Sequence, residues 1–131
     1  MPYINIRVNQ PLAQETCQVL QQTTTQLMDD VMGKRREVTV VQIEESRPEQ
    51  WSVNAESLNL SAPTAAYVDI KITAGTNSEE EKARMVQQVI VMLHEQIGTL
   101  QEACYVVIDE IPAMNWGYNG QTQAARAANR L

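Results

Sequence analysis

The chain has 131 residues, 44% of them hydrophobic, which is enough for one domain with a packed core. Its net charge of −6 argues against broad binding to nucleic acids or anionic membranes, because both need a basic protein surface. No apolar run reaches the roughly 20 residues needed to cross a bilayer, and no charged-then-apolar leader opens the sequence. We therefore expect a cytoplasmic protein without nucleic-acid or membrane partners.

The residues that most often hold metals are scarce in this chain. Its two cysteines, Cys17 and Cys104, form no CxxC pair, and His94 is the single histidine. A Cys/His metal site needs more ligands than these. We interpret the cysteines as small hydrophobes and His94 as a surface residue of a helix. We expect neither a metal nor a cofactor.

The first half of the chain predicts a strand, a helix and a second strand. Residues 2–8 alternate apolar and polar side chains, as in a half-buried strand. Between residues 12 and 32 the apolar side chains recur mostly at helical spacing, and Gly33 suits the position after a helix end. Residues 38–43 are rich in β-branched side chains, which favour a strand. The polar stretch that follows, up to about Pro63, indicates a connector.

The second half predicts the same order of elements. Residues 67–73 alternate as a strand, and Ser78 with Glu81 has the spacing of a helix capping box. Apolar residues at helical spacing continue to Gly98, which ends the predicted helix. Residues 104–108 form the last long predicted strand, and a segment rich in Pro, Gly and Asn follows.

Four landmarks recur along the chain at a nearly constant offset. Pro2 and Ala66 differ by 64 positions, and the pairs Gly33 and Gly98, Glu45 and Glu110, and Trp51 and Trp116 each differ by 65. We infer two tandem β-α-β units, about 2–52 and 65–117, with a linker of about 53–64 and a C-terminal segment of 118–131. Within it, the alanine-rich stretch Gln121–Leu131 is expected to be helical or frayed.

Two such units predict a single α+β domain. A helical crossover joins parallel strands, so each unit contributes two parallel strands and one helix. The four main strands then form one sheet with both helices on one face. We expect apolar side chains on the other face as well, covered by other subunits.

Two segments of the sequence resemble a known family. The start Met1-Pro2 on a strand and the segment Glu110–Gly117, with its Glu-x-Pro-x-x-x-Trp-Gly pattern, are similar to the tautomerase superfamily. That superfamily includes 4-oxalocrotonate tautomerase and macrophage migration inhibitory factor, and the length resembles its fused two-unit members. The resemblance implies a homotrimer and an isomerase that interconverts keto and enol forms of a small 2-oxo acid. It also implies that Pro2 is the general base or acid, whereas Ala66 holds only an amide nitrogen.

The residues near Pro2 can be assigned by chemistry and by resemblance. An amine in an apolar pocket, or near a cation, has its pKa lowered toward the working pH. Tyr3, Tyr105 and Trp116 could provide apolar walls, and Lys34 a cation that stabilises an enolate oxygen. The resemblance to migration inhibitory factor assigns Lys34, Tyr105 and Trp116 to the pocket. The structural alternatives are a solvated helix end for Lys34, a core or interface position for Tyr105 and a packing role for Trp116.

The expected arginines of several family branches are absent. The oxalocrotonate tautomerases carry one arginine after the first strand and one on the strand after the helix, where this chain has Leu12 and Val40. A dicarboxylate clamped by two arginines is therefore not predicted. Arg36, a candidate substrate-binding residue, or Lys71 could substitute, but the sequence orients neither side chain.

Two alternatives to a tautomerase stay open from the sequence. One is a decarboxylase or dehalogenase-type relative that uses a protonated Pro2. The other is a non-catalytic trimeric binding or scaffold protein, which the missing arginines favour. Catalysis by Pro2 depends on removal of Met1, because a retained methionine would convert the Pro2 amine into an amide.

Overall fold

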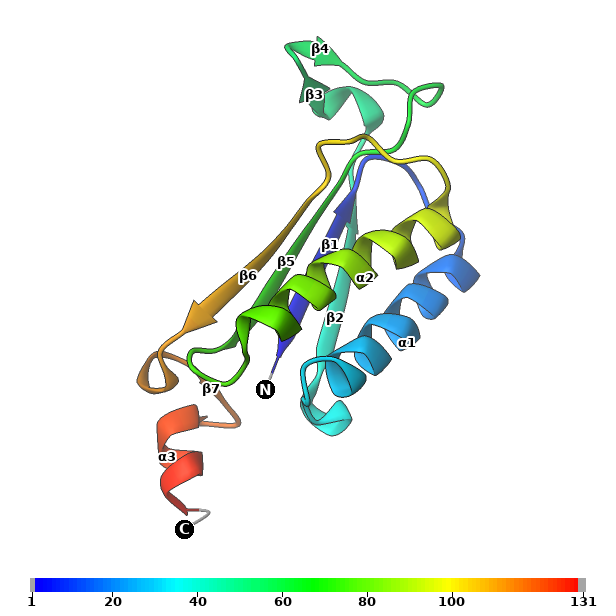
Figure 1. Cartoon of the computed structure of the whole chain (residues 1–131). Helices are drawn as coiled ribbons and strands as arrows, with labels where there is room; N and C mark the ends of the chain where they lie inside the picture. Colours follow the sequence, from blue (N-terminus) through cyan, green and yellow to red (C-terminus); the bar gives the residue numbers. More distant parts are fainter. Residues whose placement is uncertain (1, 130–131) are drawn as a thin grey trace.

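The computed structural model describes residues 2–129, which form one four-stranded sheet with two long helices on the same face (Figure 1). The sheet order is β2-β1-β5-β6. Its strands are β1 (Tyr3–Val8), β2 (Val40–Glu45), β5 (Ala66–Thr73) and β6 (Tyr105–Ile111), and the helices are α1 (Gln14–Asp30) and α2 (Glu79–Ile97). The predicted α+β architecture is confirmed.

Strand pairing relates the two units by an approximate two-fold rotation. β1 pairs with β2 in parallel and β5 with β6 in parallel, while β1 and β5 meet antiparallel at the centre. The start of β1 therefore lies beside the end of β5, and the start of β5 lies beside the end of β1. We call the end of the sheet where β1 starts the Pro2 end, and the opposite end, where β5 starts, the Ala66 end.

The core lies between the sheet and the helices. Along β1, the side chains of Ile4, Ile6 and Val8 are fully buried. α1 contributes Leu20 and Met28 to this cluster, and α2 contributes a longer apolar stripe of Met85, Val89, Met92 and Leu93. Burial of such side chains contributes about 1.5–3 kcal/mol each, so this layer holds both units together.

The two helices begin differently. α2 starts at Ser78, whose hydroxyl accepts from the Glu81 N–H at 3.1 Å, while the Glu81 carboxylate accepts from the Ser78 N–H at 2.8 Å. This is the predicted capping box. The hydrogen bond from the Ser78 backbone lowers the pKa of Glu81, with a further contribution from Asn77. α1 starts after Ala13, which offers no side-chain cap.

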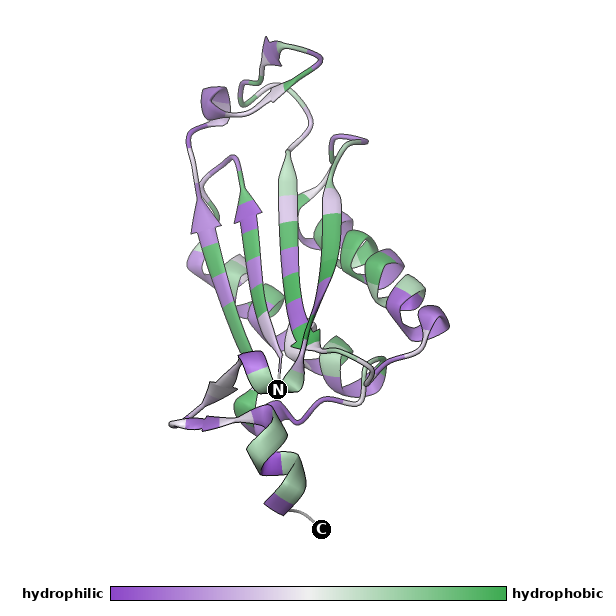
Figure 2. Cartoon of the chain, turned by 90° about the vertical axis from the view of Figure 1, so that its left-hand side faces the viewer, coloured by the Kyte–Doolittle hydropathy of each residue, from purple (hydrophilic) through white to green (hydrophobic). Residues whose placement is uncertain are grey.

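The open face of the sheet, away from the helices, mixes polar and apolar side chains. Apolar and polar residues alternate along the strands (Figure 2). The open face carries polar and aromatic side chains together with the apolar Val107: Tyr3, Asn5, Arg7, Tyr67, Asp69, Lys71, Tyr105 and Asp109. Apolar side chains were expected on this face as well, and Val40 and Val107 lie there. The period of two sends most of the other Ile and Val side chains of the strands to the helix face.

Several small elements decorate the sheet, and the sequence did not indicate most of them. The connector folds into η2 (Pro48–Gln50) and the hairpin β3 (Ser52–Val53) with β4 (Glu56–Ser57), and η1 (Arg36–Val38) precedes β2. After β6 come η3 (Ala113–Asn115), β7 (Gly117–Tyr118), β8 (Gln121–Thr122) and the expected C-terminal helix α3 (Gln123–Asn129). Within residues 2–129, no helix combines the length and the apolar character needed to span a membrane.

Candidate active site

A cavity of about 400 Å³ opens at the Pro2 end. Its walls come from the start of β1, from η1 and β2, from β5 and from β7. The lining residues are Pro2, Tyr3, Val38, Val40, Lys71, Trp116, Gly117 and Tyr118. Most of these side chains are apolar or aromatic, so a charged amine at Pro2 is less well solvated than on a polar surface. We call this space the Pro2 cavity.

Pro2 is anchored at this cavity by the sheet. Its carbonyl accepts a hydrogen bond from the Val40 N–H at 3.3 Å, and its ring is buried. The next residue, Tyr3, lies opposite Val40 on one side and Lys71 on the other. The predicted base therefore lies directly before β1, next to a residue that is paired on both sides, which restricts its position more than a free loop would.

The hairpin β7–β8 forms the aromatic wall. The Trp116 indole donates to Thr73 Oγ1 at 3.1 Å, which ties the wall to the end of β5. A Cβ on Gly117 would overlap the Gln121 backbone, so this strand pair can close only with glycine there. The Arg126 guanidinium stacks 3.8 Å from the centre of the Tyr118 ring and donates to the Tyr118 carbonyl. α3 therefore supports the wall from behind.

Lys71 is the cation that lines this cavity. Its ammonium donates to Asp109 Oδ2 at 2.9 Å and lies 3.3 Å from Asp69 Oδ2. The hydrogen bond to Asp109 raises the pKa of Lys71, so the side chain stays charged. The antiparallel register of β1 and β5 brings Lys71 beside Tyr3, and the sequence offered no orientation for it before that register was known.

A family model described as a tautomerase enzyme matches residues 2–60 and, a second time, residues 67–126. The chain belongs to the tautomerase family. The predicted resemblance and the prediction of a tautomerase-type isomerase are confirmed, and the double match agrees with the two-unit repeat.

Individual relatives of this tautomerase agree with the family match. A probable tautomerase K2 of Dickeya dadantii (strain 3937) is 36% identical over 60 residues, which is 46% of this chain and 90% of the relative. A native fused 4-OT superposes with a TM-score of 0.85 at 19% identity, covering 95% of this chain and 98% of the other. A macrophage migration inhibitory factor-like protein from Entamoeba histolytica superposes at 0.76 and 18% identity, covering 92% and 97%. The last two likenesses show the fold.

Two predicted substrate-binding cations of this tautomerase lie outside the Pro2 cavity. Lys34 follows α1 and lines a neighbouring cavity, where its ammonium donates to Thr76 Oγ1 at 2.8 Å. Arg36 turns back to α1 and donates to Gln26 Oε1 at 2.7 Å. The resemblance assigned Lys34 to the pocket, and the sequence offered no orientation for Arg36; in the structure the two side chains have different partners, Thr76 and Gln26.

Tyr105 of this tautomerase lies at the Ala66 end. It pairs with Tyr67, which in turn pairs with Arg7, whereas the Pro2 cavity adjoins Tyr3 and Lys71. The Tyr105 side chain is 65% exposed on the open face of the sheet. Within one chain it is therefore removed from Pro2 by the length of the strand, and its predicted role in the site stays a prediction.

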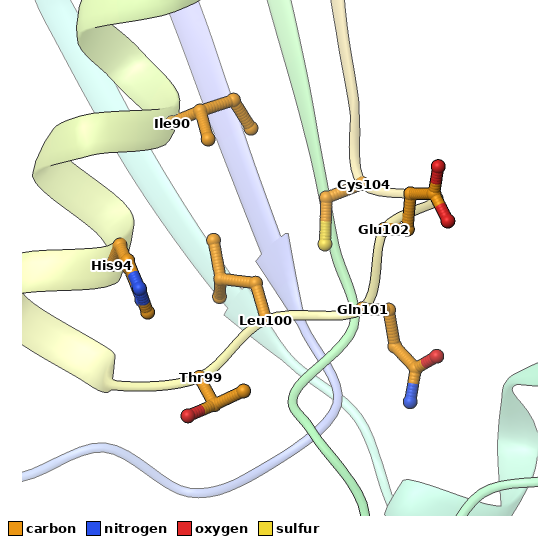
Figure 3. A pocket seen from close by; sticks show the side chains of 7 residues that line it. All are labelled: Ile90, His94, Thr99, Leu100, Gln101, Glu102 and Cys104. Carbon is orange, nitrogen blue, oxygen red and sulfur yellow. The ribbon is translucent and has the colours of Figure 1, made fainter.

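A further cavity of about 300 Å³ lies between the end of α2 and the start of β6 (Figure 3). In that view Leu100 stands between His94 and Cys104. The His94 imidazole contacts the Gly98 carbonyl at 2.7 Å, and burial raises the pKa of the Cys104 thiol. A nucleophilic cysteine needs a lowered pKa and an adjacent base, so this cavity of the tautomerase has no such pair among its lining residues.

Proposed function

We propose that this protein is a keto–enol tautomerase of small 2-oxo acids, with the amine of Pro2 as the proton-transferring group. The observation that carries the proposal is the position of Pro2 in an apolar cavity that also holds the Lys71 ammonium. A structural neighbour, Pt0534, was crystallised after inactivation by 2-oxo-3-pentynoate. That ligand is a small 2-oxo acid, which supports this class of substrate.

The proposed reaction needs one base and one group that stabilises charge. The Pro2 nitrogen takes a proton from the carbon beside the substrate carbonyl. The C–H electron pair becomes the C=C bond, the carbonyl pair moves to oxygen, and the oxygen then takes a proton to complete the enol. The reverse sequence restores the ketone, so atoms and oxidation states balance. Apolar walls disfavour a charged amine, which helps Pro2 to act as a base near neutral pH.

Lys71 would stabilise the oxygen on which negative charge develops. An ammonium group has three N–H donors, and Asp109 and Asp69 engage two of them. The third is left for a substrate oxygen. Because both aspartates hold the side chain in place, little reorganisation is needed as the enolate forms. The same charge can also attract the carboxylate of a 2-oxo acid.

We also propose that the active form is a homotrimer assembled through the open sheet face. Fused 4-OT proteins that share this fold are trimers, with TM-scores of 0.83 in both symmetric and asymmetric forms. Asn5 Oδ1 is buried on this face without a hydrogen-bond partner among the described residues. Tyr105 lies on the same face, so a neighbouring chain could bring it to a Pro2 cavity. Light scattering should give three times 14.7 kDa.

Covalent labelling tests the role of Pro2 directly. The electron-poor alkyne of 2-oxo-3-pentynoate should react with a free secondary amine, giving one adduct per chain on the tryptic peptide that contains Pro2. Intact mass spectrometry should first show that Met1 has been removed. A protein that keeps Met1, or that is labelled elsewhere, contradicts the proposal.

Kinetics provide the second test. In Pro2→Ala, the rate of phenylpyruvate tautomerisation, followed by ultraviolet absorbance, should fall about 10²-fold or more, which is the usual contribution of a general base. Pro11→Ala, an exposed proline after the first strand, is the matched control and should retain the rate. An unchanged rate in Pro2→Ala would end the proposal, and product analysis would then address the decarboxylase alternative.

A further inference from the structure

A cavity of about 460 Å³ lies at the Ala66 end of the sheet. It is formed by β3, by the loop before β6 and by the start of β6. The lining residues are Val53, Gln101, Glu102, Ala103, Cys104 and Tyr105. Its volume falls within the range of small-molecule sites, roughly 300–1,000 Å³. We call this space the Ala66-end cavity.

The Ala66-end cavity is the counterpart of the Pro2 cavity in the second unit. Three of its lining residues stand at an offset of 65 from residues that line the Pro2 cavity: Ala103 from Val38, Tyr105 from Val40 and Val53 from Tyr118. No free amine can arise here, because the nitrogen of Ala66 is a backbone amide that donates to Cys104 Sγ at 3.3 Å. The second unit has therefore kept a cavity without the group proposed to transfer protons.

The charge beside the two cavities has changed sign. The segment Arg35–Glu37 precedes β2, and its counterpart at an offset of 65 is Leu100–Glu102, before β6. The first segment carries two positive charges and one negative, a net +1, whereas the second carries only the negative charge of Glu102, a net −1. In the first unit Glu37 pairs with Arg35 at 3.6 Å. Glu102 has kept the carboxylate and lost that cation, because Leu100 stands in its place.

The Glu102 carboxylate is available to a ligand. No Lys or Arg side chain of the described residues lies within ion-pair distance of it. None of the residues that line the Ala66-end cavity is positively charged. The carboxylate points away from His94 and Leu100 of the neighbouring cavity (Figure 3). An exposed carboxylate at a partly apolar wall attracts cations, and the net charge of −6 acts in the same direction.

We propose that the Ala66-end cavity binds a small organic cation, a primary ammonium group on an aromatic body. The ammonium pairs with Glu102, and the body lies against Val53 and Ala103. The Tyr105 ring adds a surface that attracts cations. An anionic ligand is disfavoured, because the lining offers no cation and Glu102 would repel it. A divalent metal ion is also disfavoured, because it needs more oxygen ligands than one carboxylate supplies.

NMR of the full-length protein tests this binding. In ¹⁵N-labelled protein titrated with 2-phenylethylammonium chloride at constant ionic strength, the backbone amide signals of Ala103 and Tyr105 should shift and saturate. Those of their counterparts Val38 and Val40 should not. 2-Phenylethanol has the same aromatic body without the charge and should bind about threefold more weakly, or less well still. A linear drift at Ala103, saturation only at Val38 and Val40, or equal binding of the alcohol overturns the proposal.

Variants test the role of the carboxylate. Glu102→Gln keeps the size of the side chain without its charge and should weaken ammonium binding about threefold or more in calorimetry. Glu37→Gln is the matched change in the first unit and should leave the affinity unchanged. Ala103→Leu places a larger side chain at an exposed lining position and should also weaken binding. Pro2→Ala should bind like the wild type, which separates this site from the proposed catalysis. Unchanged affinity in Glu102→Gln excludes the proposed contact, and the dispersion of the NMR spectra shows that each variant is folded.

Discussion

The two ends of the sheet are built from equivalent parts of the two β-α-β units, but they differ in the chemistry of the backbone nitrogen at Pro2 and at Ala66. At the Pro2 end, β1 is preceded by a residue whose nitrogen becomes an amine once Met1 is removed, and this residue lines a cavity. At the Ala66 end, the equivalent nitrogen is an amide that donates to Cys104 Sγ at 3.3 Å. Ala65 next to it donates to Asn9 Oδ1 at 2.9 Å. At the Ala66 end, the backbone N–H groups of Ala65 and Ala66 are therefore engaged in hydrogen bonds within the fold.

The cations at the two ends also differ in their surroundings. Lys71 and Arg7 lie 64 positions apart and occupy equivalent places on β5 and β1. Lys71 is held by two aspartates at the Pro2 cavity, whereas Arg7 pairs with Glu44 at 3.6 Å and lies 5.7 Å from the centre of the Tyr67 ring. A duplicated unit can therefore lose chemistry at one end and keep its fold, because the helix-facing core does not depend on either cation.

The largest expected difference between the ends is in catalysis. Lys71→Met should lower kcat/KM for phenylpyruvate about 10–100-fold, because the enolate loses its stabilising cation and two aspartates are left without a partner. Arg7→Met, the matched change at the Ala66 end, should lower it less than about twofold, since an exposed ion pair contributes little. Steady-state kinetics decide between them. Equal losses in both variants would remove Lys71 from the mechanism, and recovery in Lys71→Arg would confirm that charge is needed.

The next effect is on the wall of the Pro2 cavity. In Gly117→Ala, the added methyl group overlaps the Gln121 backbone, so β7 and β8 must separate. We expect a loss of about 1–3 kcal/mol in the free energy of unfolding, as for other overpacked sites, together with reduced activity. Gly75→Ala is the control: its φ of +79° is strained, but nothing lies within 4 Å of the new atom. It should lower stability by about 1 kcal/mol. A larger loss of activity in Gly75→Ala would contradict the assigned wall.

Most of the fold was predictable from the sequence. The spacing of apolar residues is a local signal, and the offset of 65 residues between equivalent landmarks is a repeated one. The alternation of β1 and β5, the Ser78 capping box and the glycine stops all express backbone preferences that do not depend on distant residues. The candidate site was only partly predictable. Pro2 and Trp116 reach the same cavity as expected, since both belong to the motif.

The cations were harder to predict because their positions depend on strand register and on turns. Lys71 lies beside Pro2 only because β1 and β5 pair antiparallel with Tyr3 opposite Lys71. Lys34 and Arg36 are two residues apart, yet the Lys34 ammonium donates to Thr76 after β5 and the Arg36 guanidinium donates to Gln26 on α1.

A smaller contrast concerns the two tryptophans. Trp116 donates to Thr73 at the Pro2 cavity, and Trp51 donates to Ser46 Oγ at 2.7 Å beside the β3–β4 hairpin. Replacing either indole by phenylalanine removes one hydrogen bond and should lower the free energy of unfolding by about 0.5–1.5 kcal/mol. Only Trp116→Phe should also change KM, because Trp116 lines the Pro2 cavity and Trp51 does not. A change of KM in Trp51→Phe would mean that a change near the β3–β4 hairpin is transmitted to the Pro2 cavity.

The smallest expected effects come from the unequal starts of the two helices. Ser78→Ala removes the cap of α2 and should cost about 1 kcal/mol of stability, whereas Ala13→Ser adds a cap to α1 and should gain up to a similar amount. Chemical denaturation at pH 7 measures both. If the two changes are combined, their effects should nearly cancel, because the caps belong to different helices.

The pH dependence separates the two halves of this capping box. The pKa of Glu81 is lowered in the folded protein, chiefly by the hydrogen bond from the Ser78 backbone, so its carboxylate stabilises the fold above the unfolded pKa near 4.5. That contribution is lost as the pH falls through the lowered folded value. In Glu81→Gln the stability should therefore fall below that of the wild type at pH 7, and the difference should shrink on acidification below pH 4.5. A difference that stays constant with pH would mean that the Glu81 charge does not contribute, and that Ser78 alone holds the start of α2.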